Sequence, residues 1–268
     1  MKLEGSKILL TGASSGIGAA LAPILAERGA TVGIAARRAD RLEEVLELCR
    51  KHTPGSRMWA VDLSDLDAAE KLALDAWDAF GGYDAVIHNA AIPKRVHISR
   101  LTVADMAETM NINFDSPVRM TLAVLPKMLE RKSGTIVWVS SMGGRIQIAN
   151  ESAYNAAKYA MCGFAEAMVL DLGGSGVDVK LIMPGPIATE IWDIPGNEPA
   201  LIDIEKVPAA DCAAGIADAL EDDGFEYYVP PVYPGGIGAK DLALAKVQDC
   251  DNYLAGMASM AQAMRGES

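Results

Sequence analysis

The feature that most constrains the fold is a regular alternation of short apolar runs with longer amphipathic segments. The apolar runs fall at residues 7–12, 31–37, 58–63, 83–91, 134–141 and 177–185. Strands and helices in strict turn form right-handed crossover units, which build a parallel sheet covered by helices on both faces. Near-continuous valine, isoleucine and leucine is typical of strands buried on both faces. We therefore expect an α/β fold with a parallel sheet.

Length and composition indicate one soluble globular domain. The chain has 268 residues, half of them apolar and 6% aromatic, and it shows no linker or long repeat. We expect a single domain over residues 1–268. The formal charge of −12 makes the surface repel anions, so nucleic acid is an improbable partner and a phosphate-bearing ligand needs local donors.

Cysteine spacing and hydropathy exclude several other classes of protein. The four cysteines are scattered without a CxxC motif, so we expect reduced, buried thiols and no metal site. The apolar run near the N-terminus is too short for a signal peptide, and no stretch reaches the length of a membrane span. A cytoplasmic location without membrane contact is the expectation.

A glycine-rich segment, TGASSGIG, occupies residues 11–18 after the first apolar run and begins a helix. In that context glycines allow the backbone to close on a pyrophosphate, which the helix N-terminus holds. The alternative is that the glycines serve only tight packing of strand and helix. We favour a dinucleotide site, with contacts from the residues Gly12, Ser14, Ser15, Gly16, Ile17 and Gly18.

The end of the second apolar run indicates which dinucleotide binds. An acidic residue there would favour NAD, and an arginine would accommodate the 2′-phosphate of NADP. The chain has Ala36 where the acid would fall, followed by Arg37 and Arg38, so NADP (NADPH) is predicted and NAD is less favoured. The alternative is that both arginines are solvated charges at a helix start. Asp62 could bind the adenine amino group or cap a turn.

A tyrosine and a lysine four residues apart indicate proton chemistry. Tyr154 and Lys158 would stack on one helical face, with Ser141 thirteen positions earlier. A free phenol has a pKa near ~10, and an ammonium about 4 Å away could lower it toward neutrality together with an oxidised nicotinamide. Tyr154 would then act as the general acid or base, and Ser141 would hold the substrate oxygen. An ordinary surface pair is the alternative.

The motifs TGASSGIG, HNAA, MNINF, WVSS, YNAAK and PGPIAT occur in order, and together they resemble the short-chain dehydrogenase/reductase family, in its branch with TGxxxGxG and YxxxK motifs. The resemblance covers residues 7–189 and implies a single Rossmann-type domain, a doubly wound parallel sheet and a nicotinamide cofactor. It implies a catalytic tetrad of Asn113, Ser141, Tyr154 and Lys158, with Ser141 preferred over Ser140. Asn113 would distort its helix and hold a water that returns the proton of Tyr154 through Lys158.

The resemblance also implies further cofactor contacts and a tendency to associate. The implied contacts are Leu63, Asn89, Ala90, Pro184, Gly185, Ile187 and Thr189, besides Tyr154 and Lys158 themselves. It implies a homo-oligomer, a dimer or a tetramer, formed through the helices of Asn113 and Tyr154. His88 and Ala91 depart from the family's usual NNAG sequence, and the family's common C-terminal ending is absent. Tetramer contacts built on that ending therefore cannot be assumed.

The substrate region is predicted less sharply. Met142, Ile191 and Trp192, beside Ser141 and Tyr154, suggest an apolar enclosure, with residues 190–210 as a covering loop and residues 240–268 as a helical tail. The cations Lys94, Arg95 and Arg145 could bind an anionic group of the substrate.

The leading functional hypothesis is an NADP-dependent carbonyl reductase or alcohol dehydrogenase, of the EC 1.1.1 type, acting on a small-molecule carbonyl or alcohol. The alternatives are a non-catalytic NADP-binding redox sensor and a dehydratase or epimerase on the same scaffold.

Overall fold

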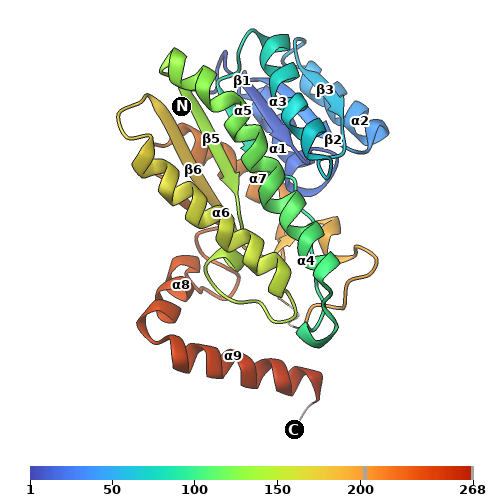
Figure 1. Ribbon diagram of the computed structural model, residues 1–268, viewed down its shortest axis with the longest axis vertical. Coiled ribbons are helices and arrows are strands. Elements are labelled where there is room, and N and C mark those ends of the chain that lie inside the picture. The colour runs from blue at the N-terminus through green and yellow to red at the C-terminus, as the bar shows by residue number, and fades with distance from the viewer. Residues whose placement is uncertain (202–203, 267–268) are drawn as a thin grey trace.

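A computed structural model describes residues 1–201 and 204–266, and its centre is a sheet of seven parallel strands. Their order is β3-β2-β1-β4-β5-β6-β9 (Figure 1). The strands are β1 (Lys7–Thr11), β2 (Thr31–Ala36), β3 (Arg57–Ala60), β4 (Ala85–His88), β5 (Gly134–Val139), β6 (Val177–Pro184) and β9 (Glu226–Val229). Every neighbouring pair is parallel, as the alternating sequence pattern predicts.

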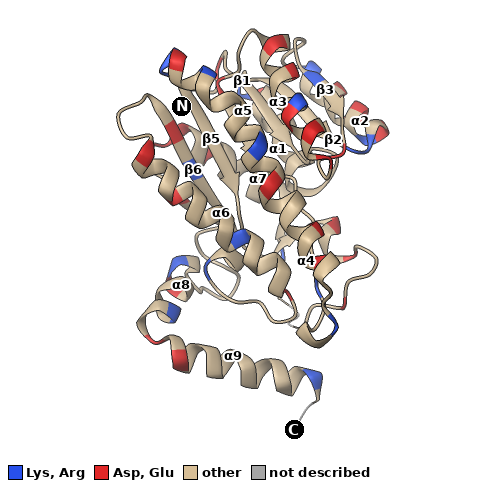
Figure 2. Ribbon diagram, viewed as in Figure 1, with Lys and Arg blue, Asp and Glu red and all other residues tan. Residues whose placement is uncertain are grey.

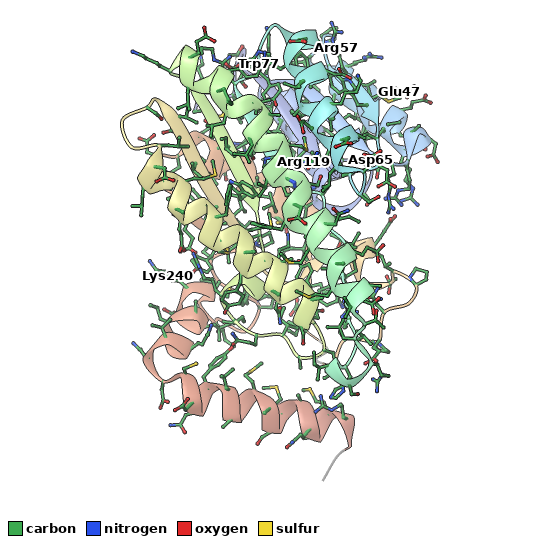
Figure 3. All side chains as sticks on the ribbon, viewed as in Figure 1. Glu47, Arg57, Asp65, Trp77, Arg119 and Lys240 are labelled. Atoms are coloured by element: carbon green, nitrogen blue, oxygen red, sulfur yellow. The ribbon has the colours of Figure 1, made fainter. Side chains whose placement is uncertain are left out.

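Helices cover both faces of the sheet and enclose two apolar cores. One core contains α1 (Gly16–Glu27), α2 (Ala39–Arg50) and α7 (Ala209–Glu221). The other contains α3 (Leu66–Phe80), α5 (Ser116–Arg131) and α6 (Ser152–Asp171). Figure 3 shows the side chains that fill these layers. The arrangement is the doubly wound, Rossmann-type α/β fold.

The strand order places a ligand-binding crevice at one edge of the sheet. The chain winds outward from β1 through β2 to β3, then returns to place β4 on the other side of β1. In doubly wound sheets, ligands bind beyond the carboxyl ends of the strands where the order reverses. Here that point lies between Thr11, at the end of β1, and the residues that follow His88 in β4.

One helix on the second face is interrupted. Between α4 (Val103–Met110) and α5, residues Asn111–Asp115 form a π-helix. Such bulges in a helix frequently mark functional sites. The predicted distortion of the helix around Asn113 is therefore present in the structure.

The chain after β6 departs from the regular pattern. Short strands β7 (Ile187–Ala188) and β8 (Val207–Pro208) pair in parallel, with a 3-10 turn at Glu190–Trp192 between them. The predicted covering loop, residues 190–210, includes residues 202–203, which lie outside the described residues.

The C-terminal tail consists of two helices, α8 (Ala239–Gln248) and α9 (Cys250–Arg265). Figure 1 shows α9 set apart from the sheet. From α8, Lys246 Nζ donates to the carbonyl oxygen of Arg145 at 3.1 Å, which joins the tail to the loop after β5. The predicted tail, residues 240–268, ends in residues 267–268, outside the described residues.

The cysteines differ in part from the prediction. All four are free thiols, but Cys250 is exposed at the start of α9 and only the other three are buried. Over the described residues, the structure contains neither a group of residues able to hold a metal ion nor a helix long and apolar enough to cross a membrane. Figure 2 shows acidic and basic residues interspersed over the outer helices.

Candidate cofactor cleft and catalytic cluster

A cleft of about 380 Å³ opens beyond the carboxyl ends of β1, β2 and β4. Twelve of its lining residues were predicted as cofactor or substrate contacts: Gly12, Ser14, Ser15, Gly16, Ile17, Arg37, Arg38, Asp62, Leu63, Asn89, Ala90 and Thr189. Ile191 lines it as well. These predicted residues therefore lie together around one cleft.

The glycine-rich loop forms one wall of the cleft, and its backbone conformation requires glycine at two positions. Gly12 has φ +71° and Gly16 has φ +54°, in the left-handed region that disfavours other residues. A Cβ on Gly12 would lie 2.7 Å from the Cα of Ala90. Ser15 precedes α1 without forming a side-chain cap, and the first turn carries no acidic residue. The N–H groups of this turn can therefore donate to a phosphate.

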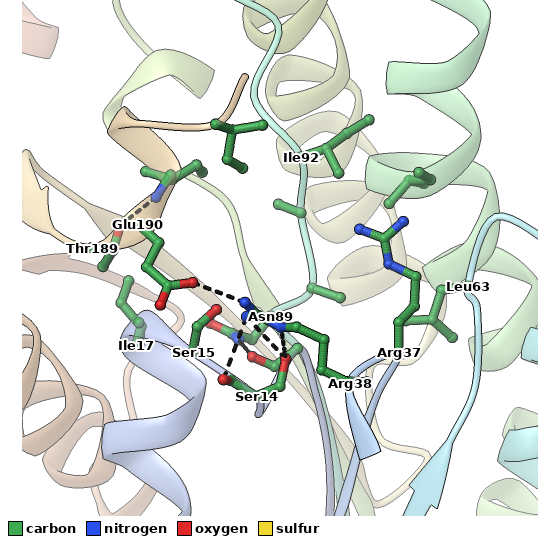
Figure 4. A pocket seen from close by; sticks show the side chains of 18 of the residues that line it. Ser14, Ser15, Ile17, Arg37, Arg38, Leu63, Asn89, Ile92, Thr189 and Glu190 are labelled. Atoms are coloured by element: carbon green, nitrogen blue, oxygen red, sulfur yellow. Dashed lines mark hydrogen bonds and ion pairs between the residues drawn. The ribbon is translucent and has the colours of Figure 1, made fainter. Parts of the chain in front are cut away.

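Two arginines stand at the mouth of the cleft and point in different directions (Figure 4). The Nε of Arg38 donates to the Ser14 hydroxyl at 3.3 Å, and its Nη1 lies 3.0 Å from a carboxylate oxygen of Glu190. Arg41 pairs with the same carboxylate. Arg37 extends separately on the side of Leu63 and is exposed. Glu190 thus bridges the mouth from the segment after β6, a contact that sequence reasoning missed.

The end of β3 and the residues after β4 complete the crevice. Asp62 accepts a hydrogen bond from the backbone N–H of Ser64 at 3.0 Å, which lowers the pKa of its carboxyl, and Arg37 lowers it further. Asp62 therefore forms the predicted turn and also lines the cleft. After β4, the backbone N–H groups of Asn89 and Ala90 donate to the Thr11 hydroxyl, each at 3.1 Å.

The catalytic cluster joins the end of β5 to the first turns of α6. Ser141 follows β5, and its hydroxyl accepts from the backbone N–H of Gly143 at 3.1 Å. A hydrogen bond links the side chains of Ser141 and Tyr154. The Nζ of Lys158 lies 5.6 Å from the centre of the Tyr154 ring. The helical spacing of four residues thus brings the phenol and the amine together, as the sequence predicts.

Lys158 is held firmly within the protein. Its side chain is 2% exposed, and its Nζ donates to the Val139 carbonyl at 2.9 Å. Burial lowers the pKa of this amine to about 8. The neighbouring Ser140 directs its hydroxyl to the carbonyl of Lys158 at 3.0 Å, so Ser140 supports the helix while Ser141 faces the phenol.

The protein itself perturbs the pKa of Tyr154. In the structure it lies well above its ordinary value, because burial and the nearby carboxylate of Glu151 disfavour the phenolate. The hydrogen bond with Ser141 and the charge of Arg95 act in the opposite direction. An ammonium at helical spacing therefore does not by itself bring this phenol toward neutrality.

Asn113 lies in the π-helix and is fully buried. Its side chain accepts from the N–H of Ile92 at 2.8 Å and donates to the carbonyl of the same residue at 2.9 Å. Ile92 lines the cleft. Asn113 thus fixes the chain that follows β4, a contact between distant segments that spacing alone could not predict.

Six predicted cofactor contacts are not among the lining residues of the cleft: Gly18, Tyr154, Lys158, Pro184, Gly185 and Ile187. Gly18 packs on the glycine loop, where an added Cβ would lie 2.4 Å from the carbonyl oxygen of Gly12. Gly185 packs against the ring of Tyr233, and Ile187 belongs to the core.

The predicted substrate residues separate in the structure. Met142 is 4% exposed and packs in the core with α6. Trp192 is half-buried, and its indole N–H donates to the Ile187 carbonyl at 2.6 Å. The ring also lies 5.0 Å from the guanidinium of Arg95, which forms a buried ion pair with Glu151 that the sequence did not reveal.

Comparisons with known proteins agree with this geometry. The family model described as short chain dehydrogenase matches residues 6–196. A relative, the 3-oxoacyl-[acyl-carrier-protein] reductase FabG of Vibrio cholerae, is 32% identical over 209 residues, covering 78% of this chain and 84% of that protein.

Solved structures share the fold. A short chain dehydrogenase from Burkholderia cenocepacia in complex with NADP has a TM-score of 0.78 at 24% identity, covering 96% of this chain and 99% of that one. A short chain dehydrogenase/reductase from Burkholderia phymatum in complex with NAD has a TM-score of 0.77 at 23% identity, covering 86% and 91%. Fold, motifs and matched family model agree, and the chain belongs to the short-chain dehydrogenase/reductase family of oxidoreductases.

Proposed function

We propose that the protein is an NADP(H)-dependent oxidoreductase that transfers a hydride between nicotinamide and a ketone or secondary alcohol. The observation that carries this proposal is the cluster of Ser141, Tyr154 and Lys158, in which a buried amine lies 5.6 Å from the ring of a phenol hydrogen-bonded to a serine. This cluster follows β5, next to the strands that form the cleft. Membership in the family supports the same assignment.

The cleft fits a dinucleotide. The uncapped first turn of α1 can hold the pyrophosphate, and Asp62 and Asn89 can contact the adenosine. Ala36 supplies no carboxylate for a ribose hydroxyl, whereas Arg37 and Arg38 line the mouth and can bind a 2′-phosphate. Of the two structures of similar fold, one is in complex with NADP and the other with NAD, so they do not distinguish the two cofactors. The preference for NADP therefore rests on the two arginines.

The residues of the cluster divide the chemistry among them. When bound, the nicotinamide supplies or accepts the hydride, and the positive charge of its oxidised ring lowers the pKa of Tyr154. Tyr154 donates a proton to the substrate oxygen during reduction, and Ser141 stabilises the charge that develops there. Lys158 would hold the nicotinamide ribose and would return a proton to Tyr154. Asn113 keeps the π-helix and Ile92 in place beside this path.

We propose that residues 190–210 cover the substrate, because Ile191 lines the cleft and Trp192 packs against Arg95 near Tyr154. The proposal includes a homo-oligomer in the cytoplasm that associates through α4, α5 and α6.

The test is turnover of a panel of ketones, followed by NADPH absorbance. The wild-type protein should oxidise NADPH with some of them, and Tyr154→Phe should lower kcat by about 10²-fold or more while leaving the Kd for NADPH nearly unchanged. A matched control is Tyr83→Phe, since Tyr83 is a fully buried phenol in the core between α3 and β4. Substantial turnover by Tyr154→Phe would contradict the proton role.

The same assay separates the alternatives. A redox sensor would bind NADPH without consuming it in the presence of any substrate. A dehydratase or epimerase would convert substrate without net oxidation of NADPH. The combination of serine, phenol and buried amine favours hydride transfer, because a sensor needs no proton donor at this place.

A further inference from the structure

A buried ion pair lies beside the catalytic phenol. Arg95, in the segment after β4, places its Nε 2.8 Å from a carboxylate oxygen of Glu151, which directly precedes α6. The two side chains are only 4% and 7% exposed. Burial raises the pKa of the Glu151 carboxyl while Arg95 lowers it. Glu151 precedes Tyr154 by three residues at the start of α6, about one helical turn, and both charges act on the pKa of Tyr154 with opposite signs.

The remaining contacts of Arg95 attach the proposed substrate cover to the catalytic helix. Its Nη1 donates to the carbonyl of Glu198 at 3.1 Å and to that of Trp192 at 3.4 Å. The guanidinium also lies 5.0 Å from the centre of the Trp192 ring. The charge of Arg95 is therefore balanced by Glu151 through Nε, and its Nη1 is engaged by the cover.

The other two cations that could receive an anionic substrate are also paired. Lys94 contacts the carboxylate of Asp105, and the Nε of Arg145 lies 2.8 Å from Glu226. Arg145 contacts the carboxylate of Glu166 as well. Within the described part of the chain, each cation expected to hold an anionic group thus already binds a carboxylate.

One further cation approaches the cover from outside. The Nζ of Lys206 lies 5.1 Å from the centre of the Trp192 ring, but the residue is exposed. Water and salt screen an exposed charge, so Lys206 offers little compensation to a carboxylate that leaves water. Beside Tyr154, that carboxylate would instead meet the buried charge of Glu151.

We propose that the site selects an uncharged carbonyl or alcohol substrate, and that Glu151 determines this specificity by neutralising Arg95. A substrate carboxylate would lose its hydration and meet guanidinium groups that already hold carboxylates, while the buried amine of Lys158 donates to the Val139 carbonyl and serves the reacting hydroxyl, which disfavours binding of the carboxylate in the transition state. A neutral ester or ketone loses less on entering the same enclosure. This inference rests on the proposed carbonyl reduction and names its substrate class.

The experiment uses ketones in matched pairs, each as a neutral ethyl ester and as the free carboxylate. For the wild-type protein, kcat/KM with NADPH should be about tenfold or more higher for the ester. Glu151→Gln keeps an oxygen that can accept from Arg95 but removes the balancing charge. This variant should lower the preference for the ester by about tenfold, mainly through a lower KM for the carboxylate.

Two further variants separate charge from structure. Glu166→Gln makes the same chemical change on the exposed side of α6, where Arg145 keeps Glu226 as a partner, so it should retain the wild-type preference. The double variant Arg95→Met with Glu151→Gln removes both charges and should also keep the preference for the ester. If Glu151→Gln alone fails to fold, Arg95→Met alone tests the same charge: it leaves the Glu151 carboxylate unpaired and should strengthen the preference for the ester, and an unchanged preference would overturn the inference.

The outcomes distinguish this inference from the proposed function. If the wild-type protein reduces ester and carboxylate with equal kcat/KM, the specificity assigned to Glu151 is wrong and carbonyl reduction stands. If Glu151→Gln folds and keeps the full preference for the ester, Glu151 is not its cause. If no ketone in either form is reduced with NADPH, the proposed function itself fails.

Discussion

Replacing Lys158 with methionine should stabilise the protein near neutral pH and remove most of its activity. Lys158 is 2% exposed, and burial lowers its pKa from the ordinary value of 10.5 to about 8. The charged amine is therefore less stable in the folded protein than in the unfolded chain. Methionine has a similar length and carries no charge, so it can occupy the same space without this cost.

The size of the effect follows from the pKa. Each pKa unit corresponds to about 1.4 kcal/mol, so a charged Lys158 costs the folded state about 3 kcal/mol. Between about pH 8 and about pH 10.5 the unfolded chain binds more protons than the folded protein, and the wild-type stability should rise with pH. Loss of the bond to the Val139 carbonyl costs about 1–2 kcal/mol. Lys158→Met should thus gain about 1–2 kcal/mol near pH 7.

The assay is urea unfolding of both proteins from about pH 6.5 to about pH 10, with ketone reduction measured in parallel. The advantage of Lys158→Met should shrink above about pH 8, and kcat/KM should fall by about 10²-fold or more. A matched control is Lys180→Met, in a lysine that is 3% exposed and whose pKa burial also lowers, but whose Nζ donates to three oxygens, the carbonyls of Asp222 and Gly224 and the hydroxyl of Tyr227. That variant should be destabilised near pH 7 and keep its activity.

The reasoning would be refuted by a Lys158→Met protein that is less stable than the wild type near pH 7 and that shows the same dependence on pH. Such a result would mean that the buried amine is neutral or well compensated in the folded state. Equal ketone reduction by both proteins would separately remove Lys158 from the proposed chemistry.

Two further predictions concern the cofactor cleft. Arg37→Asp should raise the KM for NADPH by about tenfold or more relative to any change in the KM for NADH, because a charge-assisted contact to the 2′-phosphate is lost. Equal changes in the two KM values, measured by steady-state kinetics, would contradict the NADP assignment. Gly12→Ala should lower the free energy of unfolding by about 1–3 kcal/mol and weaken NADPH binding, since φ is +71° and the new Cβ would lie 2.7 Å from the Ala90 Cα. In the same thermal melts Gly256→Ala, in α9 with open space around it, should be neutral or stabilising, and equal losses in both variants would argue against a special role for Gly12.

The sequence predicted those parts of the site that lie close together along the chain. The four-residue spacing of Tyr154 and Lys158 follows from helix geometry, and the glycine loop follows a strand and begins a helix. Local signals of this kind need no knowledge of distant contacts. The parallel sheet could also be predicted from the sequence, because the alternation of strands and helices specifies the crossover connections between the strands.

Long-range side-chain contacts could not be predicted. Arg95 and Glu151 are 56 positions apart, and Arg38 and Glu190 are 152 positions apart. No periodic pattern links such residues, since their contact depends on how loops from different strands meet at one edge of the sheet. The same is true of the bonds between Asn113 and Ile92, 21 positions apart.

The sequence by itself determined the class of fold and the family, and it predicted the glycine loop and the pair of Tyr154 and Lys158 on which the proposed function rests, because hydrophobic periodicity and helical spacing are local properties of the chain. Only the tertiary structure decided which charged side chains are paired with a partner of opposite charge. It paired Arg95, Lys94 and Arg145 with carboxylates and raised the pKa of Tyr154 by burial. Burial and the distances between distant charges arise when the layers pack together, and they set the electrostatics on which the proposed preference for an uncharged substrate rests.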